Sequence, residues 1–307
     1  TLVIGEQSCL LIDALNDTLM AEKALADISG ITNKPIDCLI YTHASHPDHT
    51  GGAAVLAKGV SNILARRASG GAYKHSDLIS HVGQLWGNRQ FGFLLSDAEA
   101  LSMGMGPLGE KGGKCLPLPP TDFIEGEKAR FDVDGIEVVL LAAPGETDDQ
   151  MYVWLPEDKV VCCGDNYYRS WPNLSAIRGG QYRDVAAWIE SLDKLLTLDA
   201  EILLPGHTAA IWGCEQIKNE IGAYRDGLEY ILLETLKGID QGLTPDELVE
   251  RVKLPEHLRA LPQLEELYGT VEWSIRGIYS GYVGWFDGNP THLKAMPQDQ
   301  KAEKMLS

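Results

Sequence analysis

Three histidines and an aspartate fall within seven residues of this sequence, in the stretch YTHASHPDHTGG at residues 41–52. They are His43, His46, Asp48 and His49. Imidazole and carboxylate are the ligands that zinc and similar divalent ions prefer in proteins. The stretch follows an apolar run at residues 36–40 and ends in two glycines, where a helix could begin. A tight loop there would aim several side chains at one point, so the pattern predicts a metal site.

Three more ligand candidates stand just beyond later apolar runs. They are Glu146, Asp165 and His207. A single carboxylate after a strand is usually a cap or a turn residue. Three similar placements in one chain instead predict that these side chains join the histidine loop.

Short apolar runs alternate with helical stretches through the first two hundred residues. We expect strands at residues 2–4, 8–12, 36–41, 135–141, 151–155, 159–163 and 201–204. We expect helices at residues 17–29, 51–57 and 183–198. This alternation is typical of sheets covered by helices, an α/β architecture. The Gly- and Pro-rich residues 104–120 predict a long surface loop.

The pattern becomes helical after residue 213. Apolar side chains recur at three- and four-residue spacing, namely Ile217, Ile221, Tyr224, Leu228, Ile231 and Leu232. Thr244, Pro245 and Glu247 have the spacing of a helix start with a capping box. Another apolar stripe covers residues 264–282. We therefore divide the chain into an α/β unit, residues 1–213, and an all-helical unit, residues 214–307.

The charge balance limits the partners of the chain. With 44 acidic and 26 basic residues, the net charge is -18, which argues against nucleic acid because a phosphate-binding surface is basic. A small anionic substrate remains possible, since a local arginine or metal ion can outweigh the overall field. No apolar run reaches the 18 or so residues that a membrane span requires, so we expect no span.

The cysteines and the first residues bear on the compartment. The six cysteines lack the spacing of a disulfide framework and are Cys9, Cys38, Cys115, Cys162, Cys163 and Cys214. Several lie in apolar runs, as buried free thiols do, so we expect a cytoplasmic location. The chain opens on a strand-like run without an initiator methionine. We therefore expect the native N-terminus to be truncated, which leaves a periplasmic or secreted location open.

The order of a histidine-rich loop and then strand-end Glu, Asp and His resembles the metallo-β-lactamase fold, an αββα sandwich. Short motifs resemble its alkylsulfatase branch: RQFG at 89–92, GDN at 164–166, PNLSAIRG at 172–179 and PGH at 205–207 with WG at 212–213. Two others, YGTV at 268–271 and GWFDGNP at 284–290, resemble the helical dimerisation domain of alkylsulfatases. The resemblance runs through most of the chain and implies a homodimer.

That resemblance implies two divalent metal ions side by side, which we expect to be zinc. One would be held by His43, His46 and Glu146, and the other by Asp48, His49 and His207. Asp165 would bridge them, and a water between the metals would be held by Asp48 and Asp165. Arg178 and Asn173 match positions that would meet a sulfate group. A guanidinium pairs well with tetrahedral oxyanions, although a surface ion pair is the alternative for Arg178.

The histidine loop departs from the family pattern His-x-His-x-Asp-His by one residue. Two residues, Ala44 and Ser45, separate His43 from His46. Either the loop bulges and His43 still reaches the metal, or that ligand is lost. We expect retention, because a bulge re-aims a side chain and bulges gather near active sites.

The function implied is hydrolysis of an organic sulfate ester, a small anionic molecule, to an alcohol and inorganic sulfate. Two alternatives stay open. One is another hydrolase of the same fold, such as a lactonase, an esterase or a β-lactamase. The other is a catalytically silent scaffold that oligomerises.

Overall fold

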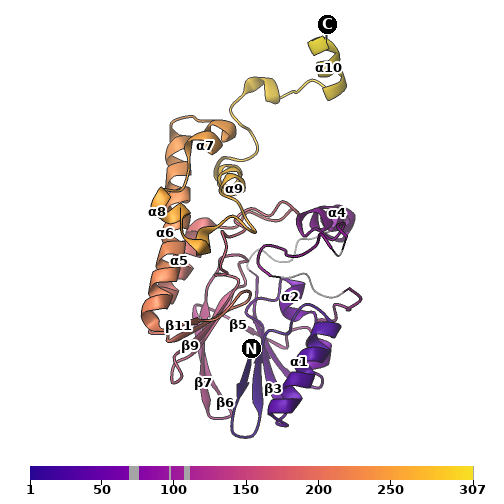
Figure 1. Ribbon diagram of the computed structural model, residues 1–307, viewed down its shortest axis with the longest axis vertical. Helices are drawn as coiled ribbons and strands as arrows, with labels where there is room; N and C mark the ends of the chain where they lie inside the picture. Colours follow the sequence, from indigo (N-terminus) through magenta and orange to yellow (C-terminus); the bar gives the residue numbers. More distant parts are fainter. Residues whose placement is uncertain (69–75, 97, 107–110, 307) are drawn as a thin grey trace.

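The structure, a computed structural model, describes residues 1–68, 76–96, 98–106 and 111–306. Two β-sheets lie face to face, and helices cover the outer side of each (Figure 1). This is the αββα arrangement that the sequence predicts. A helical region follows, and its last helix extends away from the rest of the molecule (Figure 1).

The first sheet has five strands in the order β1-β2-β3-β4-β5. They are β1 (Leu2–Ile4), β2 (Cys9–Ile12), β3 (Ile36–Ile40), β4 (Asn62–Arg66) and β5 (Asp122–Ile124). β1 is antiparallel to β2, and every other neighbouring pair is parallel. The carboxyl ends of β2, β3 and β4 therefore meet at one edge of the sheet.

The second sheet has six strands in the order β11-β10-β9-β8-β7-β6. They are β6 (Lys128–Val133), β7 (Ile136–Ala142), β8 (Met151–Leu155), β9 (Val160–Gly164), β10 (Ile202–Pro205) and β11 (Ile211–Trp212). β6 to β9 form an antiparallel meander, and β10 returns parallel to β9. The ends of β9 and β10 thus lie side by side.

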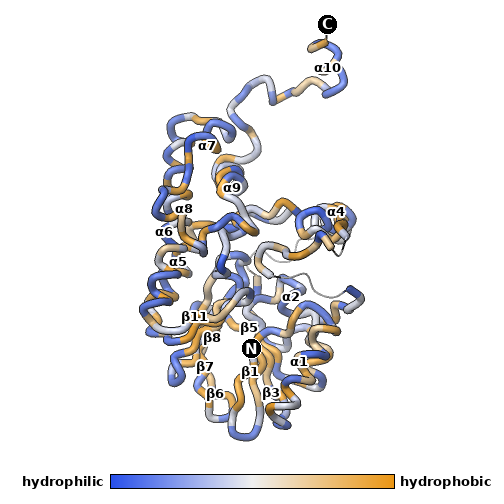
Figure 2. The backbone as a smooth tube through the Cα atoms, viewed as in Figure 1, coloured by the Kyte–Doolittle hydropathy of each residue, from blue (hydrophilic) through white to orange (hydrophobic). Residues whose placement is uncertain are grey.

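Alternating side chains divide the core into layers. Leu10 and Ile12 point between the two sheets, whereas Leu11 points to the outer helices. In the second sheet Cys162 faces inward, and its neighbour Cys163 faces the other helical layer. This is the two-residue period of a strand buried on both faces. Figure 2 shows the hydrophobic residues gathered along these strands.

The helices follow the predicted stripes in part. In the α/β unit they are α1 (Thr18–Ile31), α2 (Pro47–Thr50), α3 (Ala53–Leu56), α4 (Ser80–Gln90) and α5 (Val185–Leu196). Beyond it they are α6 (Cys214–Asp240), α7 (Pro245–Arg251), α8 (Glu256–Arg259), α9 (Val271–Val283) and α10 (Gln298–Leu306). α6 buries the predicted apolar stripe, and α7 begins with the predicted capping box of Thr244 and Glu247.

Some elements differ from expectation. The helix predicted at residues 51–57 is two short helices, α2 and α3, and the sequence reasoning missed α4, β4, β5, β6 and β11. In the predicted loop at 104–120, residues 107–110 lie outside the described residues. Residues 214–306 contain no strand. The division after residue 213 stays a prediction, because α5 and α6 pack into one shared core.

Two glycines let the histidine loop lie directly on the segment between β2 and α1. The Ala14 N–H donates to His49 O at 2.7 Å, and the Gly52 N–H donates to Leu15 O at 3.0 Å. A Cβ on Gly51 would stand 1.9 Å from Asn16 O, and one on Gly52 would stand 2.3 Å from Ala14 O. The close approach fixes the loop that carries the histidines.

We expect the Gly51→Ala variant to be destabilised by about 1–3 kcal/mol, because the new methyl group would overlap a backbone carbonyl. The measurement is the urea midpoint of unfolding. Gly30→Ala in α1 is the matched control, since a Cβ there meets nothing within 4 Å. Alanine should leave that helix unchanged or more stable by up to about 1 kcal/mol. Equal midpoints for the two variants would contradict the close approach.

Candidate metal centre

The first group of ligand atoms comes from the loop after β3 and the end of β9. His43 Nε2 lies 3.2 Å from His46 Nδ1 and 3.8 Å from Asp165 Oδ2. The ligand atoms of these three residues lie within 4.8 Å of one another. One cation could therefore contact all three.

The second group shares Asp165 with the first. Its members are Asp48, His49, Asp165 and His207, and their ligand atoms also lie within 4.8 Å of one another. His49 Nε2 lies 3.1 Å from Asp165 Oδ1, and His207 Nε2 lies 3.1 Å from Asp48 Oδ2. The structure thus places Asp165 between two adjacent groups, where a bridging ligand would stand.

Several ligand atoms are buried without a hydrogen bond. Among the described side chains, His49 Nε2, Asp165 Oδ1 and His207 Nε2 are buried and form no well-aligned hydrogen bond, although each lies 3.1 Å from another ligand atom of its group. Buried polar atoms are almost always satisfied, so these three need an explanation. Nitrogen and oxygen donors clustered in this way fit divalent ions such as zinc.

The extra residue of the loop does not remove His43 from the site. The Ala44 N–H donates to Asp149 Oδ2 at 2.9 Å, which holds the backbone just after His43. His46 then stands at the N-cap position of α2 without a side-chain capping bond, and Pro47 begins the first turn. The insertion is therefore taken up between the two histidines, and the His43 side chain remains fully buried beside Asp165. Its role as a ligand stays a prediction.

Glu146 lies at the same edge but forms an ion pair with Arg183. Arg183 Nη1 donates to Glu146 Oε1, and neither ligand group within 4.8 Å includes this glutamate. Burial raises the pKa of the Glu146 carboxyl to about 7, although Arg183 acts to lower it. Glu146 as a ligand stays a prediction.

The sequence reasoning missed Asp13, which supports one histidine of each group. Asp13 Oδ2 lies 2.9 Å from His49 Nδ1 and accepts a hydrogen bond from Thr42 Oγ1 at 2.7 Å. Thr42 Oγ1 in turn lies 3.2 Å from His43 Nδ1. These contacts occupy the Nδ1 atoms and leave the Nε2 atoms for a metal. A carboxylate just after the predicted strand at residues 8–12 was the available signal.

Arg178 and Asn173 lie next to each other, and Arg183 connects Asn173 to Glu146. With the Asn173 amide oriented to satisfy its neighbours, its oxygen accepts from Arg178 Nη1 at 3.2 Å. The Asn173 backbone oxygen accepts from Arg183 Nη1 at 2.6 Å. The alternative for Arg178 was an ion pair on the surface. Among the described residues, Arg178 forms no ion pair. Two guanidinium groups therefore flank Asn173, and the second, Arg183, was not predicted.

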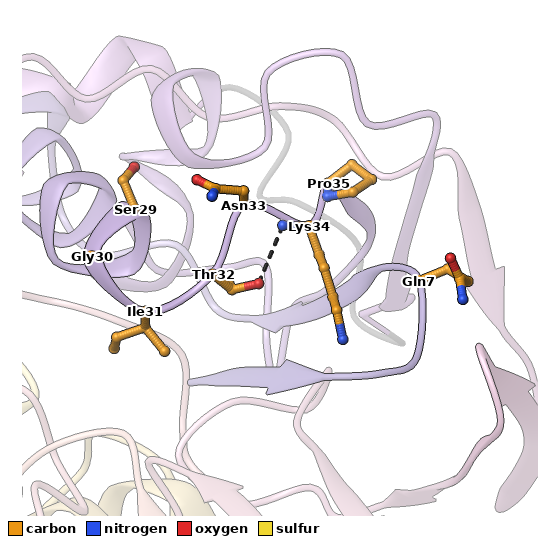
Figure 3. Close-up of a pocket in the computed structure, with 8 residues that line it drawn as sticks. All are labelled: Gln7, Ser29, Gly30, Ile31, Thr32, Asn33, Lys34 and Pro35. Carbon is orange, nitrogen blue, oxygen red and sulfur yellow. Dashed lines mark hydrogen bonds between the residues drawn. The ribbon is translucent and has the colours of Figure 1, made fainter.

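A groove of about 550 Å³ lies at the opposite end of β3, lined by residues 29–35 and Gln7 (Figure 3). Lys34, Thr32 and Ser29 in its lining form hydrogen bonds within the chain. The Lys34 N–H donates to Thr32 Oγ1 at 3.2 Å, and Lys34 Nζ donates to Gly5 O at 2.6 Å. The groove contains none of the predicted site residues, so we do not assign the chemistry to it.

An αββα sandwich with His and Asp side chains grouped at its strand ends is typical of one class of metal-dependent proteins. The family model described as "Metallo-beta-lactamase superfamily" matches residues 1–207, and the chain belongs to that superfamily. The model "Alkyl sulfatase dimerisation" matches residues 244–307. The fold family implies divalent metal ions, which agrees with the donor atoms present.

Within the superfamily, the chain is similar to alkylsulfatases along its whole length. It is 33% identical to a linear primary-alkylsulfatase of Pseudomonas sp., covering 100% of this chain and 60% of that protein. It is 28% identical to the alkyl/aryl-sulfatase BDS1 of Saccharomyces cerevisiae, covering 100% of this chain and 49% of the relative. The predicted resemblance is confirmed.

A solved structure gives the same result. The stereoselective inverting sec-alkylsulfatase Pisa1 from Pseudomonas sp. superimposes with a TM-score of 0.88 at 27% identity, covering 99% of this chain and 50% of that one. The chain thus spans about half to three fifths of the length of these relatives. In the described part of this chain, no helix is long and apolar enough to cross a membrane.

We expect Asp13→Asn to lower zinc affinity about 10- to 100-fold, because the charged partner of His49 is lost. Asparagine tolerates the positive φ of 58° at this position. Competition with a chromophoric chelator measures the affinity. Asp134→Asn, at a φ of 54° in the β6–β7 turn, is the matched control. Unchanged affinity in Asp13→Asn would show that Asp13 does not support the centre.

We expect metal-free protein to lose stability as the pH rises from 7 to 10. Burial acts to lower the pKa of His207, but Asp165 and Asp48 raise it to about 10. The unfolded-state value is about 6.5. A histidine whose pKa is higher in the folded than in the unfolded protein stabilises the fold fully at a pH below the unfolded pKa. That stabilisation is lost as the pH rises through the folded pKa.

Urea unfolding of chelator-treated protein at several pH values measures this loss. His207→Gln should show a smaller slope between pH 7 and 10, because it lacks the titrating imidazole. Identical slopes in the two proteins would contradict the assignment.

Proposed function

We propose that this chain hydrolyses organic sulfate esters to an alcohol and inorganic sulfate, using two divalent metal ions, most simply zinc. The observation that carries the proposal is the placement of two ligand groups, joined by Asp165, beside the Arg178–Asn173–Arg183 cluster. The full-length similarity to alkylsulfatases supports the same substrate class.

The proposed ligand sets follow the two groups. His43, His46 and Glu146 would hold one cation, Asp48, His49 and His207 the other, and Asp165 both. A carboxylate has two oxygens, so donation from Arg183 to Glu146 Oε1 leaves Oε2 for a cation. When bound, such cations lower the pKa of water and stabilise anionic oxygen. Asp48 and Asp165 would orient that water as hydrogen-bond acceptors.

The guanidinium groups would bind the sulfate end of the substrate. Arg178 and Arg183 carry fixed positive charge and several donors, which suits the tetrahedral oxyanion. Arg183 is 10% exposed and is already held by Asn173 O and Glu146, so it needs little reorganisation. Preorganised donors of this kind stabilise negative charge as it develops on the departing sulfate. In the balanced reaction, water adds to the ester and the C–O–S linkage breaks to alcohol and hydrogen sulfate.

The C-terminal region would form a homodimer. Residues 244–307 match the dimerisation model, and several large apolar side chains there are exposed. Trp285 is 74% exposed and Leu293 61%. A partner subunit would remove this apolar area from water, which favours association.

Elemental analysis of the purified chain, followed by sulfate-release assays on alkyl sulfates, tests the proposal. We expect two metal equivalents and metal-dependent hydrolysis of the sulfate ester. Carboxylic esters, lactones and β-lactams should be poor substrates in the same panel. Turnover only of one of those would favour another hydrolase of the fold, and low metal content without turnover would favour the scaffold.

We expect Asp165→Ala and His207→Ala each to lower kcat/KM for the sulfate ester by at least about a thousandfold, because each removes a group on which the metal site depends. Asp199→Asn is the control, because Asp199 pairs with Lys159 on the surface. Unchanged activity in both alanine variants would overturn the assignment.

A further inference from the structure

Residues 265–269, from the helical region, pack against residues 170–173, the segment that contains Asn173. The Trp171 N–H donates to Glu265 O at 2.7 Å, and the Gly269 N–H donates to Trp171 O at 3.1 Å. The Tyr268 N–H donates to Ser170 Oγ at 3.1 Å. The two segments are therefore joined through their backbones rather than only through side-chain packing.

Glycines permit this approach from both sides. A Cβ on Gly269 would stand 2.0 Å from Pro172 O. One on Gly104, which has a φ of 91°, would stand 1.9 Å from Leu267 O. The backbone of 267–269 is thus held between the loop that contains Asn173 and the loop around Gly104.

This docking buries the Tyr268 side chain in a small aromatic cluster, separate from the main core. The ring is 8% exposed and packs with Met105, Tyr168 and Phe91. Tyr168 meets it edge to face at 5.6 Å, and Phe91 stacks on it at 6.3 Å. Tyr168 lies 6.4 Å from the ring of His207, so the cluster reaches the proposed metal ligands.

The Tyr268 hydroxyl points at the proposed sulfate-binding arginine. Arg178 Nη1 donates to it at 3.4 Å, and the guanidinium lies 5.3 Å from the centre of the Phe91 ring. The Arg178 backbone N–H donates to Gln90 Oε1 at 3.1 Å. Arg178 is thus held by one hydroxyl, one aromatic face and the Asn173 amide, all of them neutral. It forms no ion pair with a described residue, although its charge acts to lower the pKa of Glu146, so its remaining donors suit an anion.

We propose that Tyr268 is a positioning residue for Arg178, so that the helical region completes the sulfate-binding side of the active site. The inference rests on the proposed function, because it takes Arg178 as the group that binds sulfate. The helical region then has a second role besides dimerisation. It supplies a side chain on which substrate affinity depends.

Tyr268→Phe tests this role, because it keeps the ring and removes only the hydroxyl. The full metal-loaded chain is titrated with inorganic sulfate by calorimetry, and KM and kcat are measured on an alkyl sulfate. We expect the sulfate Kd and KM to rise about three- to tenfold, because the variant loses one long hydrogen bond to a charged group. The kcat should stay within about twofold of the wild-type value. The metal content and the unfolding midpoint should equal those of wild type. Tyr282→Phe, on exposed α9 surface, is the matched control.

A double-mutant cycle separates positioning from direct contact. In an Arg178→Gln background, Tyr268→Phe should no longer change the sulfate Kd, because the hydroxyl acts through the guanidinium. The same fold-change in both backgrounds would overturn the proposal, as would an unchanged Kd in Tyr268→Phe alone.

The two readouts also separate this inference from the proposed function. A wild-type chain that binds sulfate with the expected coupling but hydrolyses no sulfate ester would support the inference and refute the proposed activity. A wild-type chain that hydrolyses the ester while Tyr268→Phe matches it in Kd and KM would refute the inference alone. Failure of wild type to bind sulfate would overturn the inference.

Discussion

The buried carboxylate of Asp165 is the constraint around which the site is built. It is 2% exposed and lies 3.1 Å from a ring nitrogen of His49, 3.4 Å from one of His207 and 3.8 Å from one of His43. Burial acts to raise its pKa, but His49 and His207 hold that pKa well below the usual range. An unpaired charge at this depth would be costly. The ends of β3, β9 and β10 must therefore meet at this carboxylate, and a Cβ on Gly206 would stand 2.3 Å from its Oδ1.

The site is electrically divided, although the chain as a whole is strongly acidic. The Asp13 carboxylate contacts His49 through Nδ1, the ring nitrogen that faces away from the ligand group. Arg178 and Arg183 instead contact Asn173. A cation and an anion can therefore be bound next to each other by groups of opposite sign. The net charge of -18 acts against an anionic substrate at long range, but local groups dominate within a few ångströms.

The sequence predicted much of this architecture because strands buried on both faces give continuous apolar runs. β2, β3, β8 and β9 were visible for that reason, and so were the ligand candidates that follow such runs. β6 is exposed at alternate positions, and α4 buries no residue, so neither left a strong apolar signal. Arg183 and Tyr268 were missed because their roles depend on contacts between distant segments, which periodicity does not report. Asp13 had the same strand-end signal as Asp165 and was overlooked.

The insertion of residues 265–269 also sets the order in which the site can form. Asp13 meets Thr42 and His49 across 29 and 36 residues of chain, whereas Arg178 meets Tyr268 across 90 and Ser170 meets it across 98. Closing longer loops costs more chain entropy, and contacts of high sequence separation slow folding. During synthesis the support beneath the histidines can assemble while the second sheet is still emerging. Tyr268 follows all the proposed metal ligands in the chain, so a nascent chain would contain the complete proposed ligand set before the complete set of residues that we propose to bind and position sulfate.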